Sequence, residues 1–389
     1  MKMKTKLIIA TSVPGSLASL LKGQPKYLSK SYDVTLISSP GKEINNIKQY
    51  ENVPVKSFKM SRQITLLEDL ITLIKLTIYF SKTRPKIVHS YTPKAGLLVM
   101  FASYLSGVPH RFHSVVAMPL MEAIGFKKIL LILTERITYL FSTKLFCNSK
   151  ILRLYMANNL TNRPITVIWN GSMNGIDTKY YKNNLSPKKM ANIRKKVDLT
   201  ENNFIIMFVG RIVKDKGIDE LIEAFINVEN IHPEARLLLI GDYEEKLDPI
   251  SERSRNYIEK RNTIINTGFK KDIREYLSIA NLFILPSYRE GLPHSLLEAS
   301  CYNIPLIASN INGCNEIIED RETGILIPPK NVEALTNAIC ELIDDKYLCT
   351  YLSSNLRNSV KKRFSQKIFY KHLIDEYNKE INRYVKFKF

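Results

Sequence analysis

Short apolar runs alternate with longer segments of helical periodicity through the first 170 residues of the chain. The runs predict strands at Lys6–Ala10, Val34–Ser38, Val55–Phe58, Ile87–Ser90, Arg111–Ser114, Leu145–Asn148 and Thr166–Ile168. The segments between them predict helices, among them Ser16–Ser29, Leu66–Ser81, Ala95–Ser106 and Lys128–Phe141. Strands that alternate with helices are typical of parallel βαβ units, so this part of the chain predicts a doubly wound α/β sheet.

The same alternation returns after Asn170–Asp177, which is a cluster of turn-forming residues. Here strands are predicted at Phe204–Val209, Leu237–Ile240, Thr263–Asn266, Leu282–Leu285, Pro305–Ala308 and Gly324–Ile327. The predicted helices are Pro187–Lys196, Ile218–Glu229, Ile273–Ala280, Pro293–Cys301, Gly313–Ile318, Val332–Leu342 and Phe364–Tyr384. We therefore expect a first domain at 1–175, a second at 176–362 and a terminal helical segment at 363–389.

The composition is that of an ordinary globular protein. At 389 residues, with 45% hydrophobic and 24% charged residues, the chain can form two domains with separate cores. It has no run of about eighteen apolar residues, which predicts no transmembrane helix. The apolar stretch after the basic start ends at Ser12–Gly15 and is too short for a signal peptide. Five cysteines without a Cys-x-x-Cys pair indicate buried thiols in a reducing cytoplasm.

Positive charge is concentrated in the first half of the chain. Residues 1–187 hold 26 Lys and Arg against 8 Asp and Glu, whereas residues 188–389 hold 31 against 29. This asymmetry indicates that the first half faces an anionic partner. Nucleic acid is one candidate, and an anionic membrane leaflet that carries a lipid pyrophosphate is another.

Two stretches of the second half carry candidate chemistry. The strand Phe204–Val209 leads into Gly210-Arg211 and then Lys216-Gly217 before a helix begins, an arrangement that suits a diphosphate. Glu290 leaves the strand Leu282–Leu285, and Glu298 lies about two turns along a helix predicted at Leu292–Cys301. Taken alone, the two glutamates are better explained as those of a solvated surface helix.

Together these residues carry a family resemblance. Gly210-Arg211-x4-Lys216-Gly217, followed by Glu290-Gly291-x-Pro293-x4-Glu298, resembles the signature of the family-four glycosyltransferases, which are retaining and use nucleotide sugars. The resemblance covers essentially the whole chain. It implies the GT-B fold, two doubly wound Rossmann-like domains facing a central cleft. It is strongest to enzymes that extend lipid-linked sugars for capsule or O-antigen.

The resemblance also implies roles for individual residues. Arg211 and Lys216 would offset the charge of the donor diphosphate, and Glu298 would accept hydrogen bonds from the ribose hydroxyls. Glu290 would face the donor hexose or its phosphate as a catalytic residue. Further donor contacts are implied for the backbone of Gly291, Leu292 and Pro293 and, around the nucleobase, for Gly268 and Phe269.

In the first domain the resemblance points to Gly15 and His113. Gly15 would let the backbone approach the diphosphate, although many relatives have two glycines there; the neighbouring Ser16 can instead be a helix N-cap. His113, at the end of the strand Arg111–His113, would contribute to catalysis, or it is a structural histidine.

Three further side chains of the first domain are weaker candidates. Arg111 and Glu122 could contact an acceptor. Lys94 could contact a phosphate, but a helix start capped by Thr92 explains that segment better.

The histidines and cysteines show no metal-ligand spacing, and no Asp-x-Asp follows a strand. We therefore expect no metal and no cofactor, with basic side chains serving the leaving diphosphate.

These features predict a hexosyl or N-acetylhexosaminyl transferase that uses a nucleotide diphosphate sugar, with UDP as the expected nucleotide. A polyprenyl-diphosphate-linked saccharide is the expected acceptor, bound by the first domain at the cytoplasmic face of an anionic membrane. The terminal helix is expected to pack back on that domain. Leu66–Phe80 and Lys128–Phe141 can be membrane-surface helices or half-buried core helices. Alternatives are a soluble or glucan acceptor, a scaffold without turnover and, in another class, a basic nucleic-acid-binding protein; no nucleic acid is expected as partner of the transferase.

Overall fold

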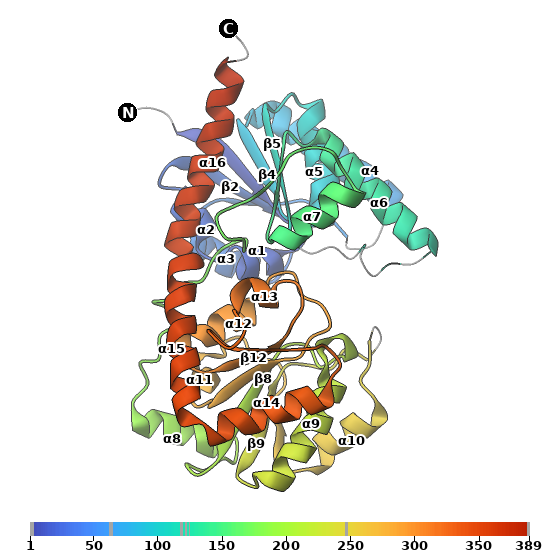
Figure 1. Ribbon diagram of the computed structural model, residues 1–389. Coiled ribbons are helices and arrows are strands. Elements are labelled where there is room, and N and C mark those ends of the chain that lie inside the picture. Colours follow the sequence, from blue (N-terminus) through green and yellow to red (C-terminus); the bar gives the residue numbers. More distant parts are fainter. Residues whose placement is uncertain are drawn as a thin grey trace. The chain divides into compact units, whose positions relative to one another are not determined.

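The computed structural model describes residues 4–61, 65–116, 120, 123, 125–245 and 248–386. The chain forms two compact units, Met1–Gly175 with Gln366–Phe389, and Ile176–Ser365. Each unit contains a parallel sheet with helices on both faces (Figure 1). This is the predicted architecture of two doubly wound Rossmann-like domains.

The first unit is built on a seven-stranded sheet with the order β3-β2-β1-β4-β5-β6-β7. Its strands are β1 (Thr5–Ala10), β2 (Tyr32–Ser38), β3 (Val55–Ser57), β4 (Ile87–Ser90), β5 (His110–Val115), β6 (Lys144–Cys147) and β7 (Ile165–Val167). All neighbouring pairs are parallel. Each predicted strand is present, with ends within two residues of the predicted ones. Because the strands are buried on both faces, their apolar runs are continuous and easily found.

The helices of the first unit differ more from the prediction. They are α1 (Pro14–Leu20), α2 (Gln24–Leu28), α3 (Ile44–Glu51), α4 (Leu66–Thr83), α5 (Pro93–Leu105), α6 (Gly125–Phe141), α7 (Lys150–Asn159) and α16 (Gln366–Lys386). The predicted single helix Ser16–Ser29 is wrong, because Gly23 adopts a left-handed φ of 83° and divides it into α1 and α2. Ser16 lies inside α1, whose N-cap is Val13, so the N-cap prediction is also wrong.

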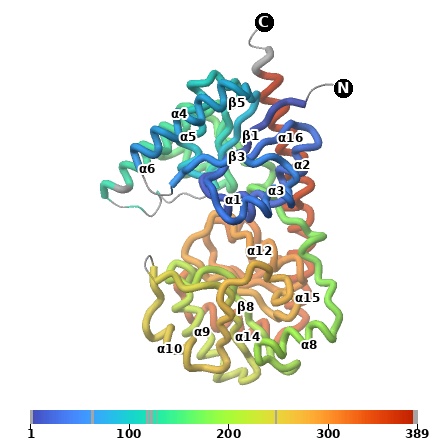
Figure 2. Tube along the Cα trace, turned by 180° about the vertical axis from the view of Figure 1, so that it is seen from behind, coloured from blue at the N-terminus to red at the C-terminus, as the bar shows by residue number. Residues whose placement is uncertain are grey.

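The terminal helix α16 packs on the sheet of the first unit (Figure 2). Its Phe369, Leu373 and Tyr377 are buried in one core with residues of strands β1 and β2. The Tyr377 hydroxyl lies 2.6 Å from Nδ1 of His89, a fully buried histidine of β4. The chain therefore returns to its first unit after completing the second.

The second unit is built on a six-stranded sheet with the order β10-β9-β8-β11-β12-β13. Its strands are β8 (Phe204–Val209), β9 (Ala235–Ile240), β10 (Ile264–Asn266), β11 (Leu282–Leu285), β12 (Leu306–Ser309) and β13 (Ile325–Ile327). Its helices are α8 (Pro187–Lys196), α9 (Ile218–Ile231), α10 (Glu252–Lys260), α11 (Arg274–Leu277), α12 (His294–Ala299), α13 (Cys314–Ile317), α14 (Val332–Asp344) and α15 (Lys346–Arg363). At its two ends, the Ile176 N–H donates to the Phe364 carbonyl at 2.7 Å, and Ile176 pairs with Ser365 as a parallel bridge.

None of the helices in the described ranges combines the length and the apolar character that crossing a bilayer requires.

Candidate active site

The strand order of the second unit reverses between β8 and β11. The chain adds β9 and β10 on one side of β8, and then returns to place β11 on its other side. Loops that leave neighbouring strands at such a switch point diverge and leave room for a ligand. The loop after β8 carries Arg211 and Lys216, and the loop after β11 carries Glu290. The two sequence motifs therefore meet at the switch point.

Glycines let these loops approach each other closely. Gly217, the N-cap of α9, has a φ of 68°, and a Cβ added to it would lie 2.1 Å from the Pro286 carbonyl oxygen. A Cβ on Gly313 would likewise lie 2.2 Å from the carbonyl oxygen of Gly291. Only glycine fits these positions without a backbone shift. Gly217, the last residue of the first motif, is thus required for the close packing of the two loops.

Lys216 and Glu290 form an ion pair at the centre of the cluster. The Lys216 Nζ lies 2.6 Å from Oε1 of Glu290, and both side chains are largely buried, with 17% and 14% exposed. The Ser287 hydroxyl donates to the same carboxylate oxygen at 2.9 Å. A predicted phosphate ligand and a predicted catalytic carboxylate are thus in direct contact.

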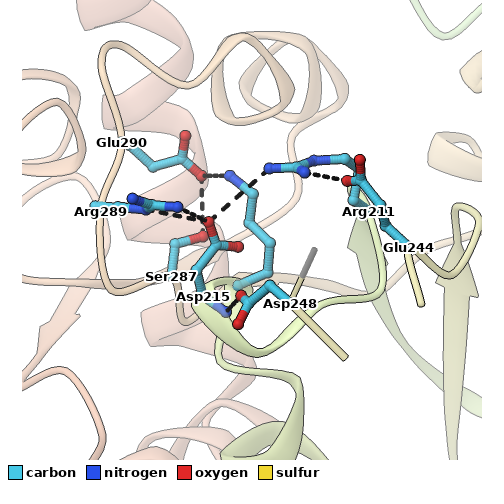
Figure 3. Close-up of polar contacts among 8 residues, drawn as sticks. Arg211, Asp215, Glu244, Asp248, Ser287, Arg289 and Glu290 are labelled. Atoms are coloured by element: carbon cyan, nitrogen blue, oxygen red, sulfur yellow. Dashed lines mark hydrogen bonds and ion pairs between the residues drawn. The ribbon is translucent and has the colours of Figure 1, made fainter. Parts of the chain in front are cut away.

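Two arginines flank this pair (Figure 3). Arg211 is half exposed, forms an ion pair with Glu244 and lies 3.9 Å from Asp215. Arg289, which the sequence reasoning did not single out, binds the same oxygen of Asp215, Oδ2, at 2.6 Å. Burial raises the pKa of Asp215, while Lys216 and Arg211 act in the opposite direction. The cluster therefore holds three cations, Lys216, Arg211 and Arg289, which are paired with the carboxylates of Glu290, Glu244 and Asp215. The signal for Arg289 was its place beside Glu290.

Glu298 lies along α12 and is held by two other side chains of the second unit. The Tyr181 hydroxyl donates to Glu298 Oε1 at 2.5 Å, and Nδ1 of His294 lies 3.3 Å from the same oxygen. Burial and the nearby carboxylate raise the pKa of Tyr181 far above its ordinary value, so the hydroxyl stays a donor. Tyr181 is 117 residues away in sequence, and no pattern in the chain pointed to it.

The loop after β10 carries an exposed aromatic ring. Gly268 has a φ of 67°, and its N–H donates to Asn266 Oδ1 at 3.0 Å. The next N–H, of Phe269, donates to Asp242 Oδ1 at 2.9 Å, and the Phe269 ring is 70% exposed. The turn thus presents a flat apolar face at the carboxyl edge of the sheet.

The segment between Glu290 and α12 is partly buried. Leu292 packs against the core of the unit, and Pro293 is the N-cap of α12. The helix predicted from Leu292 therefore begins at His294, because Pro293 is extended with a ψ of 115°. Its last predicted turn is a 3-10 turn, η3 (Ser300–Tyr302), that ends at Asn303 with a left-handed φ of 56°.

In the first unit, His113 is buried inside β5. The strand continues to Val115, so the prediction that His113 ends it is wrong. The ring is 2% exposed, and its Nδ1 lies 2.8 Å from the Ser90 hydroxyl. Burial lowers the pKa of His113 to about 4. The side chain is therefore a neutral, packed imidazole, and its role in catalysis stays a prediction.

Gly15 lies in the first turn of α1 and is exposed. Apart from its chain neighbours and the backbone of α1 itself, no heavy atom of the described chain lies within 4 Å of the position of an added Cβ. The backbone here is open to a ligand, which is what its predicted role requires.

Two of the three weaker candidates of the first unit, Lys94 and Arg111, have structural partners. Thr92 is the N-cap residue of α5, as expected, but its side chain makes no capping hydrogen bond: its hydroxyl accepts from the Ser12 N–H at 2.8 Å. Lys94 forms an ion pair with Asp69. The Arg111 guanidinium donates to the carbonyls of Val108 and Phe141. Glu122 lies outside the described residues.

Two Rossmann-like units, one with cations and carboxylates gathered at its switch point, define a glycosyltransferase of the GT-B class. The family model for glycosyl transferases group 1 matches residues 189–361. The chain is 33% identical over 373 residues to the capsular polysaccharide biosynthesis glycosyltransferase CapM of Staphylococcus aureus, with 95% of each chain covered. The chain therefore belongs to the group 1 glycosyltransferases and is a transferase enzyme.

Two further similarities agree with this assignment. The chain is 28% identical over 346 residues to the UDP-Gal:alpha-D-GlcNAc-diphosphoundecaprenol alpha-1,3-galactosyltransferase of Escherichia coli, covering 87% of this chain and 86% of that one. The crystal structure of HepE of Anabaena in complex with UDP and glucose superimposes with a TM-score of 0.80 at 18% identity, covering 96% of this chain and all of that one, and shows the shared fold. Family membership favours the enzyme over the scaffold and nucleic-acid-binding alternatives.

Proposed function

We propose that this enzyme transfers a hexosyl or N-acetylhexosaminyl unit from a UDP-sugar to a polyprenyl-diphosphate-linked saccharide in surface polysaccharide biosynthesis. The observation that carries the donor half is the Lys216–Glu290 pair, 2.6 Å apart at the switch point of the second unit. The acceptor half is supported by the E. coli relative, whose name gives an undecaprenol-linked acceptor, and by the capsular relative of S. aureus. A soluble or glucan acceptor is the alternative.

The cation cluster supplies the chemistry that a departing diphosphate needs. As the bond between the anomeric carbon and the diphosphate oxygen breaks, negative charge develops on that oxygen, and fixed cations stabilise it. The Lys216 ammonium has three donors, so it can keep Glu290 and still bind a phosphate oxygen. Arg211 and Arg289 stand on either side, and Arg211 is exposed enough to exchange Glu244 for phosphate.

In the same proposal, the acceptor hydroxyl forms its bond to the anomeric carbon on the face the diphosphate leaves, with retention of configuration. Its proton passes to the departing phosphate oxygen, so atoms and charge balance. Glu290 fixes the Lys216 ammonium and, through its second oxygen, can accept from a donor sugar hydroxyl. His113 of the first unit is kept as a second catalytic candidate, and no metal or cofactor takes part in the proposal.

The remaining contacts concern the nucleoside. Glu298 would accept from the ribose hydroxyls through Oε2, since both of its contacts in the unit are made by Oε1. The exposed Phe269 ring would stack on the base beside Gly268, and the Gly291–Pro293 backbone would line the sugar. Gly15 would approach the diphosphate from the first unit, which would also hold the acceptor at the inner face of the membrane.

Ligand-induced stabilisation tests the donor site. The purified enzyme would be melted with UDP, GDP, ADP and dTDP, beside Lys216→Ala, Arg211→Ala and Glu298→Ala. A nucleotide at a hundredfold its Kd adds about 2.7 kcal/mol of stability. UDP should stabilise the wild type and Arg357→Ala, a control that removes an exposed arginine of α15 in the same unit.

The three site variants should lose most of that shift. Stabilisation by another nucleotide would exclude UDP, and equal stabilisation of all variants would place the donor elsewhere. Transfer of labelled sugar from the stabilising donor to an undecaprenyl-diphosphate saccharide, compared with a free saccharide, then tests the acceptor.

A further inference from the structure

Helix α4 carries apolar side chains on two opposite faces. One face is buried, and its Leu76 and Phe80 belong to the core of the first unit. The opposite face presents six aliphatic side chains that are each at least 50% exposed, namely Leu66, Leu67, Leu70, Ile71, Ile74 and Ile78. A helix on the surface of a globular protein ordinarily has polar residues on its outer face. The outer face of α4 therefore has the composition of a surface that something covers.

Helix α6 repeats this feature. Phe126, Ile129, Leu133 and Leu140 follow a helical period along it and are between 53% and 79% exposed. Helix α5 lies between α4 and α6 and contacts both, and two opposite views show the three helices side by side (Figures 1 and 2). At 1.5 Å per residue, the exposed row is about 18 Å long on α4 and about 21 Å long on α6. We call these two rows together the apolar face.

Positive charge borders the apolar face. The exposed Lys75 and Lys82 of α4 line a groove with Ile71 and Ile78, next to the aliphatic row. On α6, Lys128 and Arg136 are exposed beside Ile129 and Leu133.

The carboxylates of the same helices do not offset these cations. Glu68 pairs with Lys59, Asp69 pairs with Lys94, and Glu135 is buried. The border of the apolar face is therefore basic.

We propose that the apolar face docks on an anionic lipid bilayer, with α4 and α6 lying in the plane of the interface. Aliphatic side chains would enter the boundary between headgroups and acyl chains, and the bordering lysines would meet lipid phosphates. A second copy of the chain suits this surface less well, because a symmetric dimer would bring the same lysines together. This proposal rests on the proposed function and specifies which surface would hold the enzyme at the membrane. Vesicle binding needs neither donor nor acceptor, so its failure leaves the proposed transfer reaction standing.

Vesicle sedimentation tests the proposal. The full chain would be mixed with vesicles of phosphatidylcholine alone and of phosphatidylcholine with phosphatidylglycerol. The wild type should bind the mixed vesicles more strongly, and raised salt should weaken that binding. The triple variant Leu70→Ser/Ile74→Ser/Ile78→Ser should reduce partitioning by about tenfold or more, because three exposed anchors are lost. Lys75→Gln/Lys82→Gln should weaken the preference for the anionic vesicles, since Lys128 and Arg136 remain.

The controls separate docking from misfolding and from self-association. Ile231→Ser and Tyr347→Ser remove side chains of the second unit that are 62% and 81% exposed, and they should bind vesicles as the wild type does. The triple variant should keep the circular dichroism spectrum and the Tm of the wild type, which shows that it is folded. Equal binding by the triple variant and the wild type overturns the proposal. The proposal is also overturned if light scattering shows a dimer of the wild type that the triple variant does not form, while vesicle binding is the same for both.

Discussion

Replacing Tyr181 with Phe tests how much the fixed position of the Glu298 carboxylate contributes to donor binding, because the charge of the carboxylate is kept. The Tyr181 hydroxyl donates to Glu298 Oε1 at 2.5 Å, and only 18% of the Glu298 side chain is exposed. Phe keeps the ring and removes the hydroxyl alone. Of the residues that the structure describes, the carboxylate then keeps only His294, at 3.3 Å, to hold it in place for a ribose.

The expected loss follows from the strength of that hydrogen bond. A hydrogen bond to a charged group contributes about 1.5–3 kcal/mol, and water can replace part of it because Glu298 is not fully buried. The free energy of donor binding should therefore be weakened by about 1 kcal/mol, because in the variant the carboxylate must be ordered when the ribose binds. This corresponds to UDP binding that is about fivefold weaker.

Calorimetric titration with UDP and 2′-deoxy-UDP measures this loss. Tyr181→Phe should weaken UDP about fivefold and 2′-deoxy-UDP less. In a Glu298→Ala background the same change should have no further effect, because the two side chains act as one unit. Tyr180→Phe, a change on the neighbouring ring, is the matched control and should leave affinity unchanged. Equal weakening in both backgrounds, or unchanged UDP affinity in Tyr181→Phe, would refute the positioning role.

Further predictions concern stability. Burial lowers the pKa of His113 to about 4, so the unfolded chain binds the extra proton between pH 6.5 and 4. Stability should fall by up to about 3 kcal/mol as pH drops through that window. In melting curves, the His113→Gln variant should show a smaller decrease in Tm over the same pH range. Burial raises the pKa of Glu135 to about 7, so the folded state binds the extra proton and stability is lost as pH rises from 4.5 to 7. Glu135→Gln should therefore raise Tm by several degrees at pH 8 and little at pH 4.5; equal shifts at both would contradict this. Gly217→Ala should cost about 2 kcal/mol or more and weaken UDP binding, because of its left-handed φ and its contact with a backbone carbonyl. Gly15→Ala should leave Tm unchanged or higher, so a drop in its transfer rate would support backbone approach to the diphosphate, and full activity would refute it.

The strands were predictable because each carries its own signal. Phe204–Val209 and Leu282–Leu285 match β8 and β11 residue for residue, since both are continuous apolar runs buried between helix layers. Helices were less predictable where tertiary contacts decide them. Gly23 interrupts a pattern that is otherwise helical, and its N–H donates to Glu51 of another helix. In α10 only Ser254 and Ile258 are buried, which is too few positions to show a period.

The site was predictable as far as the sheet topology determines it. Lys216 and Glu290 meet because parallel β8 and β11 are neighbours and end at the same edge. Tyr181 reaches Glu298 from an irregular segment whose path no periodic pattern specifies. His113 shows a different limit, since the sequence places it on a strand but does not say how fully the helices cover that strand. The burial of His113 depends on the shape of the covering helices. In α5, Gly96 lets the helix pack directly on the imidazole.

The second unit begins and ends at one place. Ile176 pairs with Ser365 as neighbouring strands do, and its N–H bonds to the Phe364 carbonyl. A chain segment whose two ends are adjacent can be removed, or replaced by another of the same fold, without stretching the polypeptide on either side. Residues 176–365 thus form a cassette. Recombination between related genes, or an engineer working at these two junctions, can exchange the cassette whole and leave the recipient chain's own connections as they were.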